Sequence, residues 1–202
     1  MGSIVLMGAL TGCNGGGGGD GESKSPSTSN ENQSITGTAA IGVAISGGRV
    51  SAKCVNGSTS GTTEVNGTFK LSAPGIVAPC AIQVSFGNPE KKLHSVTNTI
   101  GNVNITPITE LIAAKALGNS DLPSLFMSIR NDQLTQAAAT LPVVRQQVTT
   151  MLQYEVSVTV PKEFDPINSQ FQASVDGKPN GDAHDKILDD IKTTLESKKK
   201  DT

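Results

Sequence analysis

The sequence has few aromatic residues and little net charge. It contains no tryptophan, one tyrosine and five phenylalanines, and its formal net charge at pH 7 is −2. A core built from it must rely on valine, isoleucine, leucine and alanine, each of which buries less area than an aromatic ring. The weak charge gives no field that indicates a nucleic acid or an acidic polymer as partner. The basic run Lys198–Lys200 is typical of a solvated tail.

The sequence also lacks an apolar run long enough to cross a membrane as a helix, which takes about 20 apolar residues. The apolar stretch over residues 1–10 instead has about the length of the hydrophobic region of a secretory signal peptide. It ends in Leu10-Thr11-Gly12-Cys13, and in this it resembles a bacterial lipoprotein signal. The resemblance implies a signal peptide over residues 1–12 and acylation of the Cys13 thiol. The alternative is a disordered or buried terminus with an ordinary thiol.

No lysine or arginine precedes the apolar stretch, although signal peptides normally begin with a positive segment, so we expect a basic stretch upstream of the given start. Several acyl chains on Cys13 would anchor the protein stably, because each buried methylene contributes roughly 0.8 kcal/mol. In Gram-negative lipoproteins an aspartate after the lipidated cysteine typically marks inner-membrane retention, and Asn14 stands at that position. The resemblance therefore implies a lipoprotein of the outer membrane.

Residues 13–34 are predicted to form the lipidated cysteine and a flexible tether. From Gly15 to Gln33 the sequence contains no aromatic residue, leucine, isoleucine or valine. Such a segment cannot bury enough apolar surface to offset its ordering entropy. As a flexible coil it would span about 25 Å, enough to hold a small domain clear of a bilayer surface.

Residues 35–105 show the period-two alternation of strands with one buried face. Turn signals separate the alternating segments at Gly47-Gly48, Asn56-Gly57, Asn66-Gly67 and Gly87-Asn88-Pro89. An antiparallel β-sandwich is the economical interpretation. The apolar positions are Ile41, Val43 and Ile45; Val50, Ala52 and Cys54; Phe69 and Leu71; Ile82, Val84 and Phe86; Val103 and Ile105.

Two segments of this region resemble a known family. Gly48–Ala52, and Gly61–Leu71 with its threonine-rich start, its Asn-Gly turn and Phe69, look like the carboxypeptidase regulatory-like (transthyretin-like) β-sandwich. Glu64 stands where that family commonly carries an aspartate, so the assignment among sandwich families stays open. The resemblance implies an accessory or binding module. It implies no catalysis, because the zinc peptidase domain that names the family is a separate unit that this sequence does not contain.

Cys54 and Cys80 remain once Cys13 is acylated, and an exported protein enters an oxidising compartment. We therefore predict a disulfide between them. A redox or metal pair is the weaker alternative, because the sequence around them offers no C-x-x-C motif and no nearby histidine.

Residues 106–202 change to helical periodicity. Thr106 offers an N-cap followed by Pro107, and Gly118 offers a stop, so a helix is expected between them. Asn102–Ala114 also resembles the junction in proteobacterial lipoproteins that join such a sandwich to helices. Further helices are expected over 122–129, over 134–152 with Pro142 dividing it or starting a second helix, and after Asp182 at the end of the chain.

The alternation over 156–160 fits either a strand that returns to the sheet or a frayed helix end. The predicted fold class is thus α+β, an antiparallel β-sandwich of the immunoglobulin or prealbumin kind followed by short helices. We expect the helices to cover one face of the sandwich rather than form a separate domain, because each offers one apolar face that must be buried.

The chemical motifs are incomplete. Asp176–Asp182 has some spacing of a calcium loop, but Lys178 stands where an oxygen ligand belongs and Ile187 where a glutamate is needed, so a turn is predicted. His94 is expected as a partly exposed strand residue and His184 in the first turn of the last helix. Neither belongs to a zinc motif, and no G-x-S-x-G elbow is present. No cofactor is predicted.

Two functional hypotheses from different classes follow. The first is a lipid-anchored, non-enzymatic envelope module that binds a protein or a glycan through the sandwich loops or between sandwich and helices. The second is an envelope hydrolase with a site assembled from dispersed residues such as His94, Asp165 or Glu163.

Overall fold

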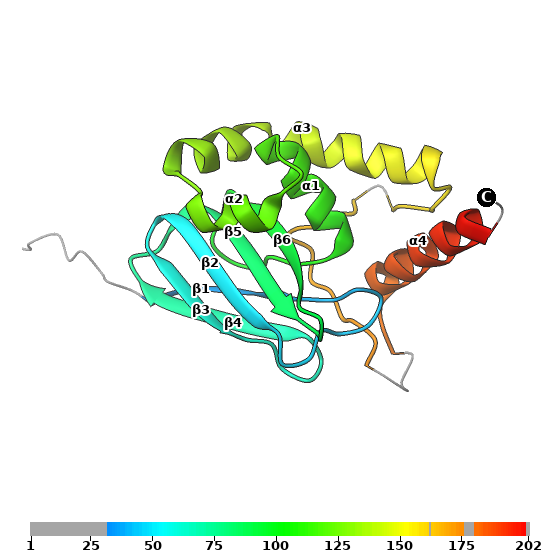
Figure 1. Cartoon of the computed structure of the whole chain (residues 1–202), viewed down its shortest axis with the longest axis horizontal. Coiled ribbons are helices and arrows are strands. Elements are labelled where there is room, and N and C mark those ends of the chain that lie inside the picture. The colour runs from blue at the N-terminus through cyan, green and yellow to red at the C-terminus, as the bar shows by residue number, and fades with distance from the viewer. Residues whose placement is uncertain (1–31, 162, 176–179, 201–202) are drawn as a thin grey trace, which may run out of the picture.

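The computed structural model describes residues 32–161, 163–175 and 180–200. The expected signal peptide, Cys13 and most of the expected tether lie outside these residues, as does the segment Asp176–Pro179. The described chain has two antiparallel sheets and four helices (Figure 1), which confirms the α+β class.

The larger sheet has four strands in the order β3-β2-β5-β6. Its strands are β2 (Arg49–Asn56), β3 (Ser58–Thr62), β5 (Val77–Phe86) and β6 (Lys91–Thr97). Gly57 and Gly87 have φ of 81° and 78° in the turns that join β2 to β3 and β5 to β6. Glycine adopts such values without steric strain, so the glycine turn signals placed these chain reversals correctly.

The smaller sheet pairs β1 (Asn32–Thr38) with β4 (Thr68–Pro74). β1 begins before residue 35, so the end of the expected tether belongs to the sheet. On its other side β1 runs parallel to residues 101–105, with the Thr36 amide donating to the Gly101 carbonyl at 2.9 Å. The alternation at Val103 and Ile105 therefore marks a buried segment that joins β1 through isolated bridges rather than a full strand.

The expected strand at Ile41–Ile45 is wrong. These residues form a tight loop, closed by the Ile45 amide donating to the Ala39 carbonyl at 2.9 Å, and Gly42 has a φ of 89°. The apolar alternation does not correspond to burial in this loop, since Ile45 is buried but Ile41 is 37 % exposed.

Four helices follow the strands. They are α1 (Pro107–Leu117), α2 (Leu122–Ser128), α3 (Asn131–Glu155) and α4 (Ala183–Lys200). The predicted limits of α1 are confirmed, because the Thr106 hydroxyl accepts from the Thr109 amide and Gly118 ends the helix in the left-handed conformation. Asp182 begins α4 in the same way, with its Oδ1 accepting from the amides of His184 and Asp185 at 2.9 and 3.2 Å.

Pro142 neither divides nor starts a helix but lies inside the continuous α3. A proline in a helix interior costs about 3 kcal/mol. The helix continues because an apolar stripe around Pro142 is buried, and each fully buried valine or leucine contributes about 1.5–3 kcal/mol. The stripe consists of Leu141, Val144, Val148 and Leu152.

Residues 156–160 form no strand, and their first part is the end of α3. Val156 is the C-cap, Ser157 has a φ of 59° and the Val158 amide donates to the Leu152 carbonyl at 3.2 Å. The rest is an irregular segment beyond α3 in which Val158 and Val160 are buried, and the Gln153 side chain donates to the Val160 carbonyl at 3.1 Å. The side chains of residues 157–160 do alternate between exposed and buried, but no described strand of either sheet pairs with this segment.

The larger sheet is covered on both faces. On one face Ile82 and Val84 join the cluster that includes Ile35 and Leu71 of the smaller sheet. On the other face Ala81 packs with Phe126 of α2 and Leu134 of α3, and Figure 1 shows α1, α2 and α3 together on this side. The four-stranded sheet therefore forms the middle layer.

The Cys54–Cys80 disulfide is present. The two cysteines lie directly opposite each other in the register of β2 and β5, and both are buried. The bond therefore links the two central strands of the larger sheet within the core.

Candidate functional site

A polar groove lies between the smaller sheet and the start of α4. It has a volume of about 680 Å³, and two of its lining residues, Phe69 and Phe171, are buried aromatics, which we call its floor. We call it the polar groove. Its lining is Thr36, Gly37, Thr38, Asn66, Thr68, Phe69, Asn102, Gln170, Phe171, Gln172, Asn180 and Asp182.

Asparagines fix the segment that brings residues 170–172 to β1. The side-chain amides of Asn104 and Asn102 donate to the Ser169 carbonyl at 2.7 and 3.0 Å. The side-chain amide of Asn168 donates back to the Asn102 carbonyl at 2.8 Å. The Thr38 hydroxyl then donates to the Phe171 carbonyl at 2.8 Å. One side of the polar groove is thus tied to β1 by side-chain bonds to backbone.

The start of α4 closes the groove on the other side. The backbone amide of Gln172 donates to Asp182 Oδ2 at 2.8 Å, and the backbone amide of Asp182 donates back to the Gln172 backbone carbonyl at 3.0 Å. The Gln172 side chain also donates to the Asn180 carbonyl at 2.9 Å. Because Asp182 is the N-cap of α4 as well, this wall and the helix start form one hydrogen-bonded unit.

The lining chemistry favours an uncharged ligand rich in hydroxyl groups. Among the described residues that line it, Asp182 alone carries a charge. Asn66, Gln170 and Asn180 are exposed, and each amide group offers both donors and acceptors. The aromatics are buried and no arginine is among the lining residues, so this part of the chain lacks the exposed anchors typical of protein interfaces.

A peptide cannot extend the sheet at this groove through β1. One edge of β1 pairs with β4 along its whole length, and the other edge bonds to residues 101–105. Gly37 permits that second contact, because a Cβ there would lie 1.9 Å from the Val103 carbonyl oxygen. Strand addition needs a free edge, and both edges of β1 are bonded at Thr36–Thr38, the part of the strand that lines the groove.

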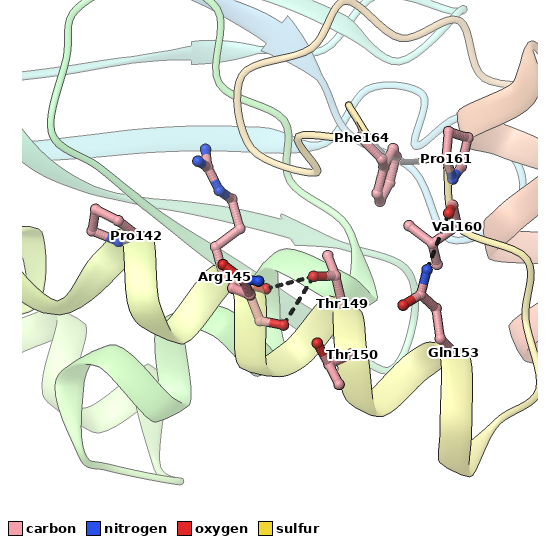
Figure 2. A pocket seen from close by; sticks show the side chains of 9 residues that line it. Pro142, Arg145, Thr149, Thr150, Gln153, Val160, Pro161 and Phe164 are labelled. Atoms are coloured by element: carbon pink, nitrogen blue, oxygen red, sulfur yellow. Dashed lines mark hydrogen bonds between the residues drawn. The ribbon is translucent and has the colours of Figure 1, made fainter.

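A second hollow, the α3 groove, lies between α3 and residues 160–164 and has a volume of about 390 Å³ (Figure 2). Its polar groups already serve the fold. Arg145 pairs with Asp165, the Thr149 hydroxyl donates to the Arg145 carbonyl at 3.1 Å, and Gln153 donates to Val160. The α3 groove is therefore a seam that holds the segment after α3 in place.

His94 is buried, not partly exposed as expected. Its Nδ1 lies 3.0 Å from Glu110 Oε2 of α1 and its Nε2 lies 3.0 Å from Gln83 Oε1 of the neighbouring strand. Its backbone amide also donates to Glu110, and its carbonyl accepts from the Thr109 hydroxyl at 3.0 Å. With an exposed fraction of 3 %, His94 joins β6 to α1 and faces no groove.

The residues named for a dispersed hydrolytic site do not come together. Asp165 pairs with Arg145 and caps the turn that follows it by accepting from the Ile167 and Asn168 amides. Glu163 is exposed. No hydrogen bond between described residues joins either carboxylate to His94.

His184 lies in the first turn of α4, as predicted, and is 5 % exposed. Its ring is held between Phe164 and Phe171, with centroid distances of 4.6 and 4.3 Å. Burial lowers the pKa of His184 to about 4, against smaller opposing effects of Asp182 and Asp165. The imidazole is therefore neutral at pH 7.

Sequence reasoning missed the polar groove. The segment that supplies Gln170, Gln172 and Asn180 has no helical or strand periodicity, so nothing placed it against β1. The sequence does contain one signal, which is the recurrence of amide side chains on two segments whose length suits no regular element. These residues are Asn102, Asn104, Asn168, Gln170 and Gln172.

The described residues contain no cluster of three or more histidine, cysteine or acidic side chains that could hold a metal ion. Within the same part of the chain, no helix combines the length and apolarity needed to span a membrane. Comparison with protein-family models, curated proteins and solved structures finds no match for this chain.

Proposed function

We propose that this protein is a lipid-anchored envelope module that binds a neutral glycan in the polar groove. The anchor rests on the lipoprotein-like signal that ends at Cys13 and on the tether-like sequence that follows. The described chain adds a small folded body of two sheets and four helices, in keeping with a sandwich-type accessory module.

The observation that carries the ligand class is the lining of the polar groove. Hydroxyl side chains of β1 and β4 and the amide side chains of Gln170, Gln172 and Asn180 line one hollow. Its single charged lining residue in the described chain, Asp182, is bound by backbone amides. An anionic ligand would find no cationic partner among the described lining residues and would face the Asp182 carboxylate, which is unfavourable in a partly buried site. A neutral glycan offers many hydroxyl groups and no charge.

Binding can be tested with the mature protein and an array of neutral oligosaccharides, followed by calorimetry on any that bind. We expect the double variant Asn66→Ala/Gln170→Ala to bind about tenfold more weakly, because each lost hydrogen bond is worth about 0.5–1.5 kcal/mol. Gln136→Ala is the matched control, since Gln136 is an exposed amide of α3 outside the polar groove. Equal loss in the control, or no oligosaccharide binding at all, would reject the proposed ligand class.

The anchor is tested separately by expressing the chain behind its native upstream region in a Gram-negative host. We expect the wild type to fractionate with the outer membrane and to carry the mass of acyl chains, while Cys13→Ala stays uncleaved and unacylated. Several acyl chains together make membrane binding effectively stable, so the wild type should resist a salt wash. A soluble, unmodified wild-type protein would refute the anchor but leave the glycan test unaffected.

A further inference from the structure

The His184 ring has no polar partner. Neither Nδ1 nor Nε2 has a hydrogen-bond partner among the described residues, and the two nearest side-chain groups are the rings of Phe164 and Phe171. A neutral imidazole in such a place leaves its donor and acceptor unsatisfied, and an imidazolium would leave two donors and a full charge there. Protonation therefore favours a state in which the ring has left the slot between the two phenylalanines.

The slot is built into the wall of the polar groove. Phe171, which packs on His184 from one side, is a floor residue of the groove, and the His184 amide donates to the Asp182 carboxylate that holds Gln172. His184 thus contacts the floor directly through Phe171 and the wall at the start of α4 through Asp182. Because the His184 amide is bonded to the Asp182 carboxylate, a movement of the first turn of α4 that frees the ring also displaces Asp182.

We propose that acid detaches the start of α4 and opens the wall of the polar groove, with His184 as the sensor. The role of this opening in ligand release rests on the proposed glycan-binding function. The glycan would then be held at neutral pH and released in acid.

The other titratable groups near His184 are carboxylates that already have partners. Asp182 and Asp165 favour the charged ring, but Asp165 is paired with Arg145 of α3 and Asp182 is bound by backbone amides. Asp185 is buried against the Ser174 hydroxyl. Loop residues 39–45, which pack near this end of α4, contain no titratable side chain.

Farther along α4, the pKa of Asp189 is raised by burial and by Asp185, with Asp190 adding to the rise and Lys192 and Lys186 opposing it. A carboxyl whose pKa is raised in the folded state favours that state more as pH falls. Asp189 therefore works against detachment in acid, and His184 works for it.

The sign and size of the His184 effect follow from linkage. Its pKa is lowered from 6.5 to about 4 on docking, so the detached state binds the proton more tightly. Docking is unaffected above about pH 6.5 and weakens as the pH falls toward 4. At pH 5 the ratio of detached to docked α4 should be about 30-fold higher than at pH 7.5.

Hydrogen exchange on the mature protein measures this opening without any ligand. We expect the protection factors of the backbone amides of Gln172 and residues 185–188 to fall about 30-fold between pH 7.5 and 5. Protection factors are already corrected for the intrinsic pH dependence of exchange. His184→Phe and His184→Leu fill the slot without a titratable group and should abolish most of this fall. His94→Gln removes the other histidine of the chain and should keep it.

Two results of the exchange experiment would overturn the inference. One is unchanged protection in the wild type at pH 5, and the other is an equal fall in both His184 variants, which would assign the effect to carboxylates. If an oligosaccharide binds at pH 7.5, its affinity should fall with acid in parallel with protection, and an affinity independent of pH despite detachment would also overturn the gate. Absence of any glycan binding refutes the proposed function, whereas the exchange data still decide whether His184 releases α4.

Discussion

Removing the Cys54–Cys80 disulfide is expected to lower the free energy of unfolding by about 3.5 kcal/mol, because the bond closes a loop of 26 residues and restricts the unfolded chain. That is a large share of the roughly 5–15 kcal/mol that stabilises a typical domain. The cysteines face the core between the two sheets, so their loss also leaves small voids among residues that are nearly all aliphatic.

The measurement is urea denaturation of the mature protein and of Cys54→Ser/Cys80→Ser. Wild-type protein unfolded and refolded under reducing conditions is the control, since it loses the bond without introducing buried hydroxyl groups. The double variant should be as stable as the reduced wild type or less stable, by about 1–3 kcal/mol for each buried hydroxyl that stays unpaired. A double variant within 1 kcal/mol of the oxidised wild type would show that the bond is not formed or that the unfolded chain is already restricted.

The second large effect is expected at Glu110. This carboxylate binds both the backbone amide and Nδ1 of the buried His94, so Glu110→Ala leaves two polar groups of β6 without partners. Each unsatisfied buried group costs about 1–3 kcal/mol, and we expect a loss of about 3 kcal/mol in the free energy of unfolding. Glu110→Gln retains an acceptor oxygen and should lose less.

Thermal and urea unfolding of Glu110→Ala should be compared with Glu90→Ala. Glu90 forms an exposed ion pair with Lys92 at 3.5 Å, and such pairs contribute about 0–1 kcal/mol. The contrast separates the loss of a buried contact from the loss of a negative charge. If Glu110→Ala and Glu90→Ala had the same small effect, water would have to satisfy His94, and the role assigned to Glu110 in joining β6 to α1 would be wrong.

The limits of secondary structure were predicted best where one or two residues determine the backbone. Thr106 and Pro107 act on the first turn of α1 and Gly118 on its last turn, so both ends of the helix follow from residues close to them in sequence. The same holds for the glycine turns, and for the cysteine pair the interpretation of Cys13 as a lipidation site left two cysteines to pair. In each case the deciding interactions are between residues close in sequence or covalently linked.

The predictions failed where distant packing outweighs local preference. Pro142 disfavours a continuous helix, but the buried stripe of α3 keeps the helix intact. Ile41, Val43 and Ile45 alternate like a strand, yet hydrogen bonds to Ala39 and Ser174 fold them into a loop. The polar groove depends entirely on such distant contacts, which is why its amide residues could not be assigned from sequence.

β1 also determines how the protein would respond to a pulling force. If the chain is held at Cys13, tension enters the folded body at Asn32, the first residue of β1. The strand is gripped on both edges, by β4 on one side and by residues 101–105 on the other, with bonds perpendicular or slanted to its axis. Tension along β1 would load these bonds together in shear rather than peel them one at a time, so β1 would act as a mechanical clamp at the start of the described chain.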